Sequence, residues 1–499
     1  MAHWPSGTRI FTTALSPIIL VLVIVCSLQS GIASGLSDSP AGPMMPSIST
    51  DEAHAKNVIL LIGDGMGHGQ VDAARWERSG HNLTAYRSPL LAMDRLAYAG
   101  NVSTASASAP ITDSAAAITA LLTGVRTNNG VIGQDATAVC GVSDGAWLET
   151  IAELAGAGGR ATGAVSNMRL THATPAGVYA HVNSRDNELL IARQFLDSGL
   201  DVGLSGGYCY FINQTATDPW GAPGLRTDGQ DLVAAAQAKG YTVVTTAPLL
   251  DAVPAAPGTK MLGLFAPSEM RYESERPGSQ QPSVAEMAEK AISVLSADDD
   301  GFFLMVEGGM IDAASGNNDY AAMTSETLAF DDAVRTALAF ADRHPDTLLI
   351  VTADHETGGV TRGENSDGTP SFFFTATDHT AADVPIMASG PGADRIGTGT
   401  IRNTQVFELM RDAMDLVPVT PTPTHRVAAV PPETALPTDG NGDGVCEDVN
   451  GNGRKDFADV VLFFNQMSWI AASEPVAAFD DNANGRIDFA DVVWLFNHL

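Results

Sequence analysis

Acidic side chains and one histidine follow apolar segments of the sequence at the points where those segments end. The residues in such positions are Asp64, Glu307, Asp312, Asp354 and His355. The carboxyl ends of parallel strands meet at one edge of a sheet, so we expect these side chains to converge. Carboxylates this close raise one another's pKa unless cations compensate their charge. Asp with His suits zinc, and carboxylates with a hydroxyl group suit magnesium.

Ser114 begins an alanine-rich helical pattern within Thr112-Asp113-Ser114-Ala115. Thr, Asp and Ser are all favoured at helix N-caps, so a structural role is one interpretation. The other places Ser114 at the positive end of a helix dipole, where an alkoxide or phosphoryl group is stabilised. Serine needs a base or a metal to act as a nucleophile. No Ser-His-Asp order with a nucleophile elbow is visible, which favours a metal.

The elements that must position these residues alternate along residues 51–417. Buried strands are predicted at the β-branched segments 57–62, 161–166, 302–307, 347–352 and 384–388. Helices are predicted at 114–122, 147–155, 229–239 and 320–342. This alternation predicts an α/β domain with a mainly parallel sheet between helical layers.

The composition is that of an acidic globular protein. Of 499 residues, 44% are hydrophobic, and 27 basic against 58 acidic residues give a net charge of −31. Such a surface repels phosphate backbones, which excludes nucleic-acid binding through a basic patch. Anionic small substrates stay compatible with it, because bound cations reverse the local field.

Residues 1–35 have the pattern of a secretory signal peptide. Arg9 precedes an apolar run over 18–26 and a small-residue segment at 31–33. We therefore expect export, to the medium or the cell surface; a retained N-terminal anchor is the alternative. In an oxidising compartment we expect at most one disulfide, with Cys140–Cys209 the favoured pair.

Several colinear motifs resemble the alkaline phosphatase family. They occupy residues 62–67, 112–115, 123–130, 173–176, 180–185, 306–309, 352–356 and 378–380. The resemblance covers nearly all of residues 51–417. It implies a large, mainly parallel central sheet between helical layers, hydrolysis of small phosphate monoesters and a homodimer.

The resemblance also implies roles for individual residues. Ser114 would be the nucleophile that forms a phosphoserine. Arg185 would hold two phosphate oxygens in a fork, which a guanidinium group can do. Asp64, Asp354 and His355 would bind the zinc ion that lowers the pKa of the serine hydroxyl.

Two further metal sites follow from the same resemblance. Asp64, Thr174 and Glu307 would bind magnesium. Asp312 and His379 would bind a second zinc ion, which stabilises the leaving oxygen and activates water.

One position departs from the family pattern. In the family, a histidine four residues after the equivalent of Asp312 completes the second zinc site, and this sequence has Gly316 there. Asp319, Asn317 or water would fill the place, with weaker metal affinity and a slower second step as the expected cost. His172, just before the magnesium motif, leaves the identity of the third metal open.

The C-terminal region is predicted as a Pro/Thr-rich linker over 418–438 and a small all-α module over 439–499. Within it, oxygen-bearing side chains recur after 32 residues at positions 1, 3, 5, 9 and 12 of a calcium loop. These residues are Asp448, Asn450, Asn452, Asp456, Asp459, Asp480, Asn482, Asn484, Asp488 and Asp491.

The repeat resembles a dockerin, an EF-hand-like calcium module, with Asp in place of Glu at position 12. The resemblance implies docking to a cohesin-type protein through loop positions 10 and 11. Those positions are Phe457-Ala458 and Phe489-Ala490 instead of a hydroxyl pair. A calcium-stabilised stalk without such a partner is the alternative.

The sequence is compatible with three functions. The first is a metal-dependent phosphomonoesterase, and the second is a phosphodiesterase or sulfatase of the same superfamily. The third is a surface binding protein whose catalytic activity is weakened because a zinc-ligand position is Gly316. A sulfatase needs a Cys or Ser within a Pro/Arg-containing motif, whereas Ser114 is followed by three alanines. Activity at saturating zinc separates an enzyme from a decayed site.

Overall fold

The computed structural model describes residues 54–276, 280–416, 430–432, 436–438, 446–452, 454–473, 479, 487 and 489–497. The predicted signal peptide and most of the predicted linker lie outside these residues. So do four predicted calcium ligands, Asp480, Asn482, Asn484 and Asp488. Within the described part of the chain, no helix is long and apolar enough to cross a membrane.

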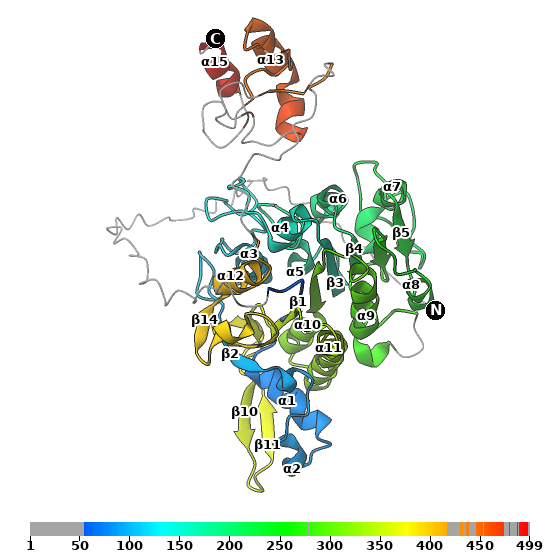
Figure 1. Cartoon of the computed structure of the whole chain (residues 1–499), viewed down its shortest axis with the longest axis vertical. Helices are drawn as coiled ribbons and strands as arrows, with labels where there is room; N and C mark the ends of the chain where they lie inside the picture. Colours follow the sequence, from blue (N-terminus) through cyan, green and yellow to red (C-terminus); the bar gives the residue numbers. More distant parts are fainter. Residues whose placement is uncertain are drawn as a thin grey trace, which may run out of the picture. The chain divides into compact units, whose positions relative to one another are not determined.

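A 10-stranded sheet forms the centre of the large domain (Figure 1). Its strands are β1 (Asn57–Gly63), β2 (Tyr98–Ser103), β3 (Ala161–Arg169), β4 (Val202–Gly206), β5 (Tyr241–Val244), β6 (Lys260–Leu264), β7 (Phe302–Gly308), β8 (Thr347–Thr352), β13 (Val384–Ser389) and β14 (Thr400–Arg402). Their order is β14-β2-β13-β8-β1-β7-β3-β4-β6-β5. β13 pairs antiparallel with β2 and β8, and the other neighbours are parallel. The predicted α/β fold with a mainly parallel sheet is confirmed.

Helices flank this sheet. They are α1 (His68–Arg78), α2 (Leu83–Tyr86), α3 (Ser114–Thr123), α4 (Ile151–Ala157), α5 (Ala173–Ala176), α6 (Glu188–Ser198), α7 (Leu232–Ala238), α8 (Ala247–Asp251), α9 (Val284–Leu295), α10 (Met310–Gly316), α11 (Tyr320–Ala341) and α12 (Asn403–Ala413). In Figure 1, β1 and β3 lie between a group made of α3, α4 and α12 and a second group made of α9 and α11.

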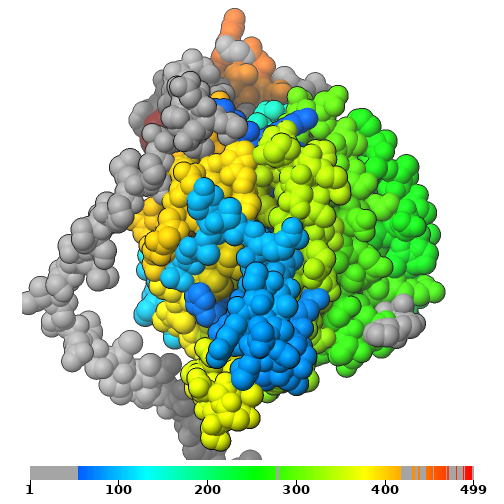
Figure 2. Space-filling model, turned by 60° about the horizontal axis from the view of Figure 1, so that its bottom comes forward, coloured from blue at the N-terminus to red at the C-terminus, as the bar shows by residue number. Residues whose placement is uncertain are grey.

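Two small sheets complete the domain. One is the hairpin of β10 (Thr361–Glu364) and β11 (Pro370–Phe373), and the other pairs β9 (Glu356–Thr357) with β12 (His379–Thr380). The hairpin lies beside α1 on the surface, where Figure 2 shows the blue and yellow segments next to each other.

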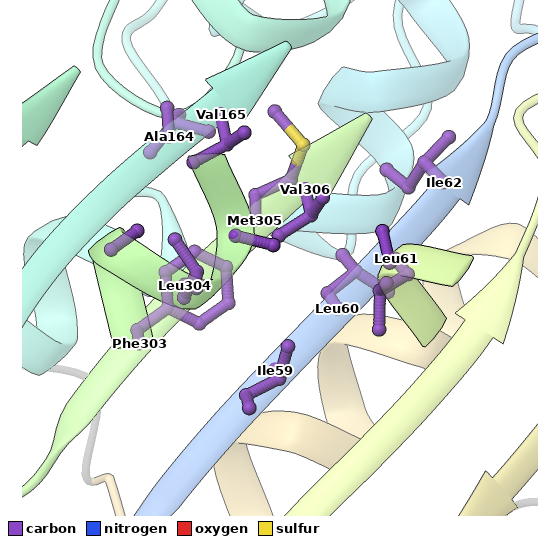
Figure 3. Packing of buried hydrophobic residues seen from close by; sticks show 14 of the residues in the cluster. Ile59, Leu60, Leu61, Ile62, Ala164, Val165, Phe303, Leu304, Met305 and Val306 are labelled. Atoms are coloured by element: carbon purple, nitrogen blue, oxygen red, sulfur yellow. The ribbon is translucent and has the colours of Figure 1, made fainter. Parts of the chain in front are cut away.

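The core lies on the central strands. All side chains from Val58 to Ile62 are fully buried, as are those from Phe302 to Val306. Figure 3 shows the side chains from Ile59 to Ile62 and from Phe303 to Val306 near Ala164 and Val165 of β3. A strand covered on both faces carries a continuous apolar run instead of an alternating one. This is why the central strands could be predicted from composition alone.

The predicted elements are found with some shifts. The helix expected at 147–155 begins only at Ile151, after the capping residue Thr150. Five strands of the central sheet, β2, β4, β5, β6 and β14, are not among the predicted ones. The predicted Cys140–Cys209 disulfide is wrong: both thiols are unpaired. The Cys209 Sγ atom is buried and lies 3.6 Å from a carboxylate oxygen of Asp218 instead.

The described part of the tail contains two helices. α13 (Phe457–Ser473) and α15 (Phe489–Asn497) pack on each other around a small core of their own. The members of that core that come from these helices are Val460, Leu462, Phe463, Ile470, Val492 and Leu495.

Candidate active site

Strand register brings the predicted acidic residues to one edge of the sheet. Ile62 of β1 lies opposite Glu307 of β7 on one side and opposite Thr352 of β8 on the other. Asp64 is the first residue after β1, and Asp354 is the second residue after β8. Residues far apart in sequence therefore meet at the carboxyl edge of the parallel strands.

The first cluster joins Asp64, Asp354 and His355, which are all buried. The Nε2 atom of His355 lies 3.3 Å from Asp64 Oδ1 and 3.2 Å from Asp354 Oδ2. Both oxygens of Asp64 and Oδ2 of Asp354 nevertheless have no hydrogen-bond partner within the described residues. Burial, and next the charge of Asp354, raises the pKa of Asp64 well above its ordinary value. Buried carboxylate oxygens without partners fit a cation held with an imidazole nitrogen, as in a zinc site.

Ser114 lies against this cluster. It is the first residue of α3, and its Oγ atom is 3.2 Å from Nε2 of His355. The N-cap of the helix is Asp113, whose side chain accepts a hydrogen bond from the Ala116 amide at 3.0 Å. The helix is therefore capped by its neighbour, and the serine hydroxyl points to the metal-ligand cluster instead of serving as the cap.

Arg185 is held from two sides. Its Nη1 atom donates to Asp113 Oδ2 at 3.0 Å, and Nη2 donates to His172 Nε2 at 3.0 Å. Burial and the charge of Arg185 lower the pKa of His172 well below its ordinary value, so the imidazole is neutral and accepts. These contacts fix the plane of the guanidinium group beside the helix that begins with Ser114.

A second cluster contains Asp64, Glu307 and His172, with Thr174 of α5 beside it. The hydroxyl of Thr174 and Oε1 of Glu307 are buried without a partner among the described residues. Burial raises the pKa of Glu307 to about 7, although the Ser166 hydroxyl donates to its carboxylate. A carboxylate pair with a hydroxyl group fits a hard cation such as Mg²⁺. The contact of Ser166 was missed by sequence reasoning.

The third cluster joins Asp312, His355 and His379. The imidazole rings of His355 and His379 stack with centroids 3.5 Å apart. The Nδ1 atom of His379 donates to the carbonyl oxygen of Thr112 at 2.9 Å, which leaves Nε2 free and 3.7 Å from Asp312 Oδ1. A hydrogen bond at one ring nitrogen prepares the other as a metal ligand.

Thr357 links the first and third clusters, and the sequence analysis did not identify it. Its buried hydroxyl donates to Asp312 Oδ1 at 2.5 Å and lies 3.2 Å from Nδ1 of His355. This leaves Nε2 of His355 to face the first cluster. The arrangement fixes the imidazole orientation that a metal ligand needs.

The position of Gly316 offers no side chain to the third cluster. Asp319, one of its expected substitutes, instead caps α11 through a hydrogen bond from the Ala322 amide at 3.0 Å. It does not belong to any metal-ligand cluster of the described residues. The family pattern places three ligands at this zinc site. The structure brings together two of them, Asp312 and His379.

The first loop of the tail is closed by its last acidic residue. Asp459 is fully buried, and its oxygens accept from the amides of Asn450 at 3.0 Å and Asp456 at 2.8 Å. Asp448 Oδ1 accepts from the Asn452 amide at 3.0 Å. Burial raises the pKa of Asp459, and the nearby carboxylates of Asp448 and Asp456 raise it further. Carboxylates gathered in this way fit calcium.

Comparison with known proteins gives one consistent match. The family model described as alkaline phosphatase matches residues 55–377. The chain is 30% identical to alkaline phosphatase 4 of Bacillus subtilis over 79% of this chain and 96% of that protein. It is 34% identical to alkaline phosphatase of Escherichia coli over 74% and 88%. The structure of alkaline phosphatase from the Antarctic bacterium TAB5 superposes with a TM-score of 0.63 at 30% identity, covering 74% of this chain and 100% of that one. A variant of that enzyme in which a histidine is replaced by glutamate has been solved with Mg bound in the M3 site.

Proposed function

The chain belongs to the alkaline phosphatase family and is a phosphomonoesterase, and from this premise we propose that it is an exported enzyme acting through a phosphoserine at Ser114. One observation carries the proposal. The Ser114 hydroxyl lies 3.2 Å from His355 Nε2, beside carboxylate oxygens of Asp64 and Asp354 that have no hydrogen-bond partner among the described residues.

The proposed reaction has two steps at Ser114. In the first, the serine hydroxyl loses its proton to solvent, the bond from Oγ to phosphorus forms, the P–O bond to the alcohol breaks, and the departing alcohol oxygen takes a proton from solvent. In the second, water attacks phosphorus and loses a proton to solvent, the bond from Oγ to phosphorus breaks, and the serine oxygen takes a proton back. Zinc held by Asp64, Asp354 and His355 would supply the Lewis acidity that lowers the pKa of the hydroxyl.

Arg185 would bind the phosphoryl group. Its guanidinium is already oriented by Asp113 and His172, so little side-chain freedom is lost when it holds two phosphate oxygens. Asp113 also caps α3. The same carboxylate residue would therefore align both the arginine and the helix that carries the nucleophile.

We assign the second cluster to magnesium. The oxygens of Thr174 and Glu307, which have no hydrogen-bond partner among the described residues, support this. The third cluster would hold the second zinc through Asp312 and His379. With Gly316 in place of a ligand, we expect this site to bind zinc more weakly than the first.

The family model matches residues 55–377 and so covers neither the N-terminal segment nor the tail. The proposals for export and for the tail rest on the residue patterns in the sequence and on the hydrogen bonds of the first calcium loop. Residues 1–35 would direct export, and the tail would bind calcium. We propose that it docks to a cohesin-type protein through exposed aromatic residues at loop position 10. Phe457 and Phe489 hold that position and are 58% and 55% exposed. A homodimer of the catalytic domain also belongs to this proposal.

The test is turnover of p-nitrophenyl phosphate by residues 36–499, titrated with zinc and magnesium. Ser114→Ala should abolish metal-dependent turnover, whereas Ser296→Ala, an exposed serine at the end of α9, should not. Mass spectrometry of the acid-quenched enzyme should find one phosphoryl group on the peptide that carries Ser114. Turnover retained in Ser114→Ala would contradict the phosphoserine mechanism.

A further inference from the structure

Asn167 is a buried side chain that joins three elements. It lies near the end of β3 and is 1% exposed. Its Oδ1 atom accepts hydrogen bonds from the amides of Gly309 at 2.7 Å and Met310 at 3.2 Å. Its Nδ2 atom donates to Oε2 of Glu326 in α11 at 3.1 Å.

The first of these contacts substitutes for a local helix cap. α10 begins at Met310, and Gly309 before it has no side chain to cap the first amides. Unpaired amides at a buried helix start are costly, so the Asn167 oxygen stabilises the start of this helix. Asp312 lies in the first turn of the same helix, and Glu307 lies two residues before Gly309. The contact therefore holds the short segment between two proposed metal ligands.

Glu326 determines which way the Asn167 amide faces. The carboxylate of Glu326 is 2% exposed, and its second oxygen accepts from the amide of Glu273. It therefore presents an acceptor to Asn167, which turns the Asn167 nitrogen toward α11 and its oxygen toward α10. A flipped amide would place its nitrogen against two N–H donors and its oxygen against a carboxylate.

We propose that Asn167, oriented by Glu326, is a positioning residue that sets the placement of Asp312 relative to Glu307 and so controls metal retention. This rests on the proposed metal-dependent function. Ser166, the preceding residue, donates to Glu307 itself. The end of β3 thus contacts both the magnesium ligand and the start of the helix that carries the zinc ligand.

An exchange of donor and acceptor tests this role. Asn167→Asp keeps an acceptor for the two amides but places a second carboxylate against Glu326. Glu326→Gln keeps an acceptor for the Glu273 amide but places a second N–H donor against Asn167. In the double variant, the side chain at position 326 donates to the side chain at position 167, so the hydrogen bond between them is restored with its direction reversed. The bonds from the amides of Gly309, Met310 and Glu273 keep their original direction.

The measurements are made at about pH 9, above the raised pKa of about 7 of Glu326, so that its carboxylate is ionised and only accepts. They are the rates of zinc and magnesium release to a chelator from the metal-loaded full chain, with kcat and KM. Loss of a partner that orients metal ligands costs about 10- to 100-fold in metal affinity. Each single variant should therefore release metal about 10-fold faster or more. The double variant should return to within about 3-fold of the parent chain. The thermal midpoint of the metal-free chain, measured alongside, shows how much each variant destabilises the fold.

Two outcomes would overturn the proposal. If the single variants release metal at the parent rate, Asn167 does not position the ligands. If the double variant behaves like the singles, the hydrogen-bond pattern is not what matters. Turnover and metal release are read separately: loss of turnover in Ser114→Ala tests the phosphoserine mechanism, and metal release from the Asn167 and Glu326 variants tests this proposal. A parent chain that retains no metal would instead refute the metal-dependent function itself.

Discussion

Replacing Gly316 by histidine should add a protein ligand to the cluster of Asp312 and His379. Gly316 is the last residue of α10 and lies one helical turn after Asp312, on the same face. A Cβ atom built there meets its nearest neighbours, Thr377 O and Thr357 Cγ2, at 3.8 and 3.9 Å. These are ordinary van der Waals contacts. The helix end should accept a Cβ atom at this position without a backbone shift.

The expected gain follows from the number of ligands. Asp312 and His379 supply two protein ligands, and an imidazole from position 316 would supply a third, which is the usual number at a catalytic zinc site. Loss of a residue that merely orients a ligand costs about 10- to 100-fold in metal affinity, and a direct ligand is worth at least as much. We therefore expect zinc at this site to bind at least about 10-fold more tightly, or about 1.4 kcal/mol.

The assay is zinc titration in competition with a chromophoric chelator, with turnover followed at each free zinc concentration. Gly316→Ala is the matched control, because it changes the same backbone position without adding a ligand. Gly316→His should shift the half-saturating zinc concentration for turnover downward by at least about 10-fold, and Gly316→Ala should leave it in place. Equal zinc affinity in the two variants would refute the reasoning that this position lacks a ligand.

Three further predictions concern other parts of the chain. Arg185→Lys should raise KM for a phosphate monoester by at least about 10-fold in steady-state kinetics, because an ammonium group cannot hold two oxygens in a fork. Burial raises the pKa of Glu326 from 4.5 to about 7, so the folded chain holds a proton that the unfolded chain releases. Its contribution to stability should be lost as pH rises from about 4.5 to about 7, and Glu326→Gln should flatten that part of the curve of thermal midpoint against pH. Asp459→Ala should abolish the calcium-induced change in circular dichroism of the full chain while leaving turnover intact, because it removes the buried carboxylate that closes the first tail loop.

The difference between the predicted and the unpredicted strands has a physical cause. β1, β7 and β8 are buried on both faces and consist of consecutive apolar residues, so composition reveals them. β2 (Tyr98–Ser103) carries Gly100 and Asn101 and is mostly exposed or half-buried. β4 (Val202–Gly206) contains two glycines in five residues. Their strand conformation depends on pairing with neighbours far along the chain, which no local pattern records.

The unpredicted site residues divide in a similar way. Ser166 and Asn167 are polar residues near the carboxyl end of a buried strand, the same position that identified Asp64 and Glu307. The rule that found the acidic ligands therefore applies to these two as well, provided that it is extended from ionisable side chains to hydroxyl and amide groups. Thr357 offers no such signal. Its importance comes from a contact with Asp312, which is 45 residues earlier and on another element, so only the folded chain reveals it.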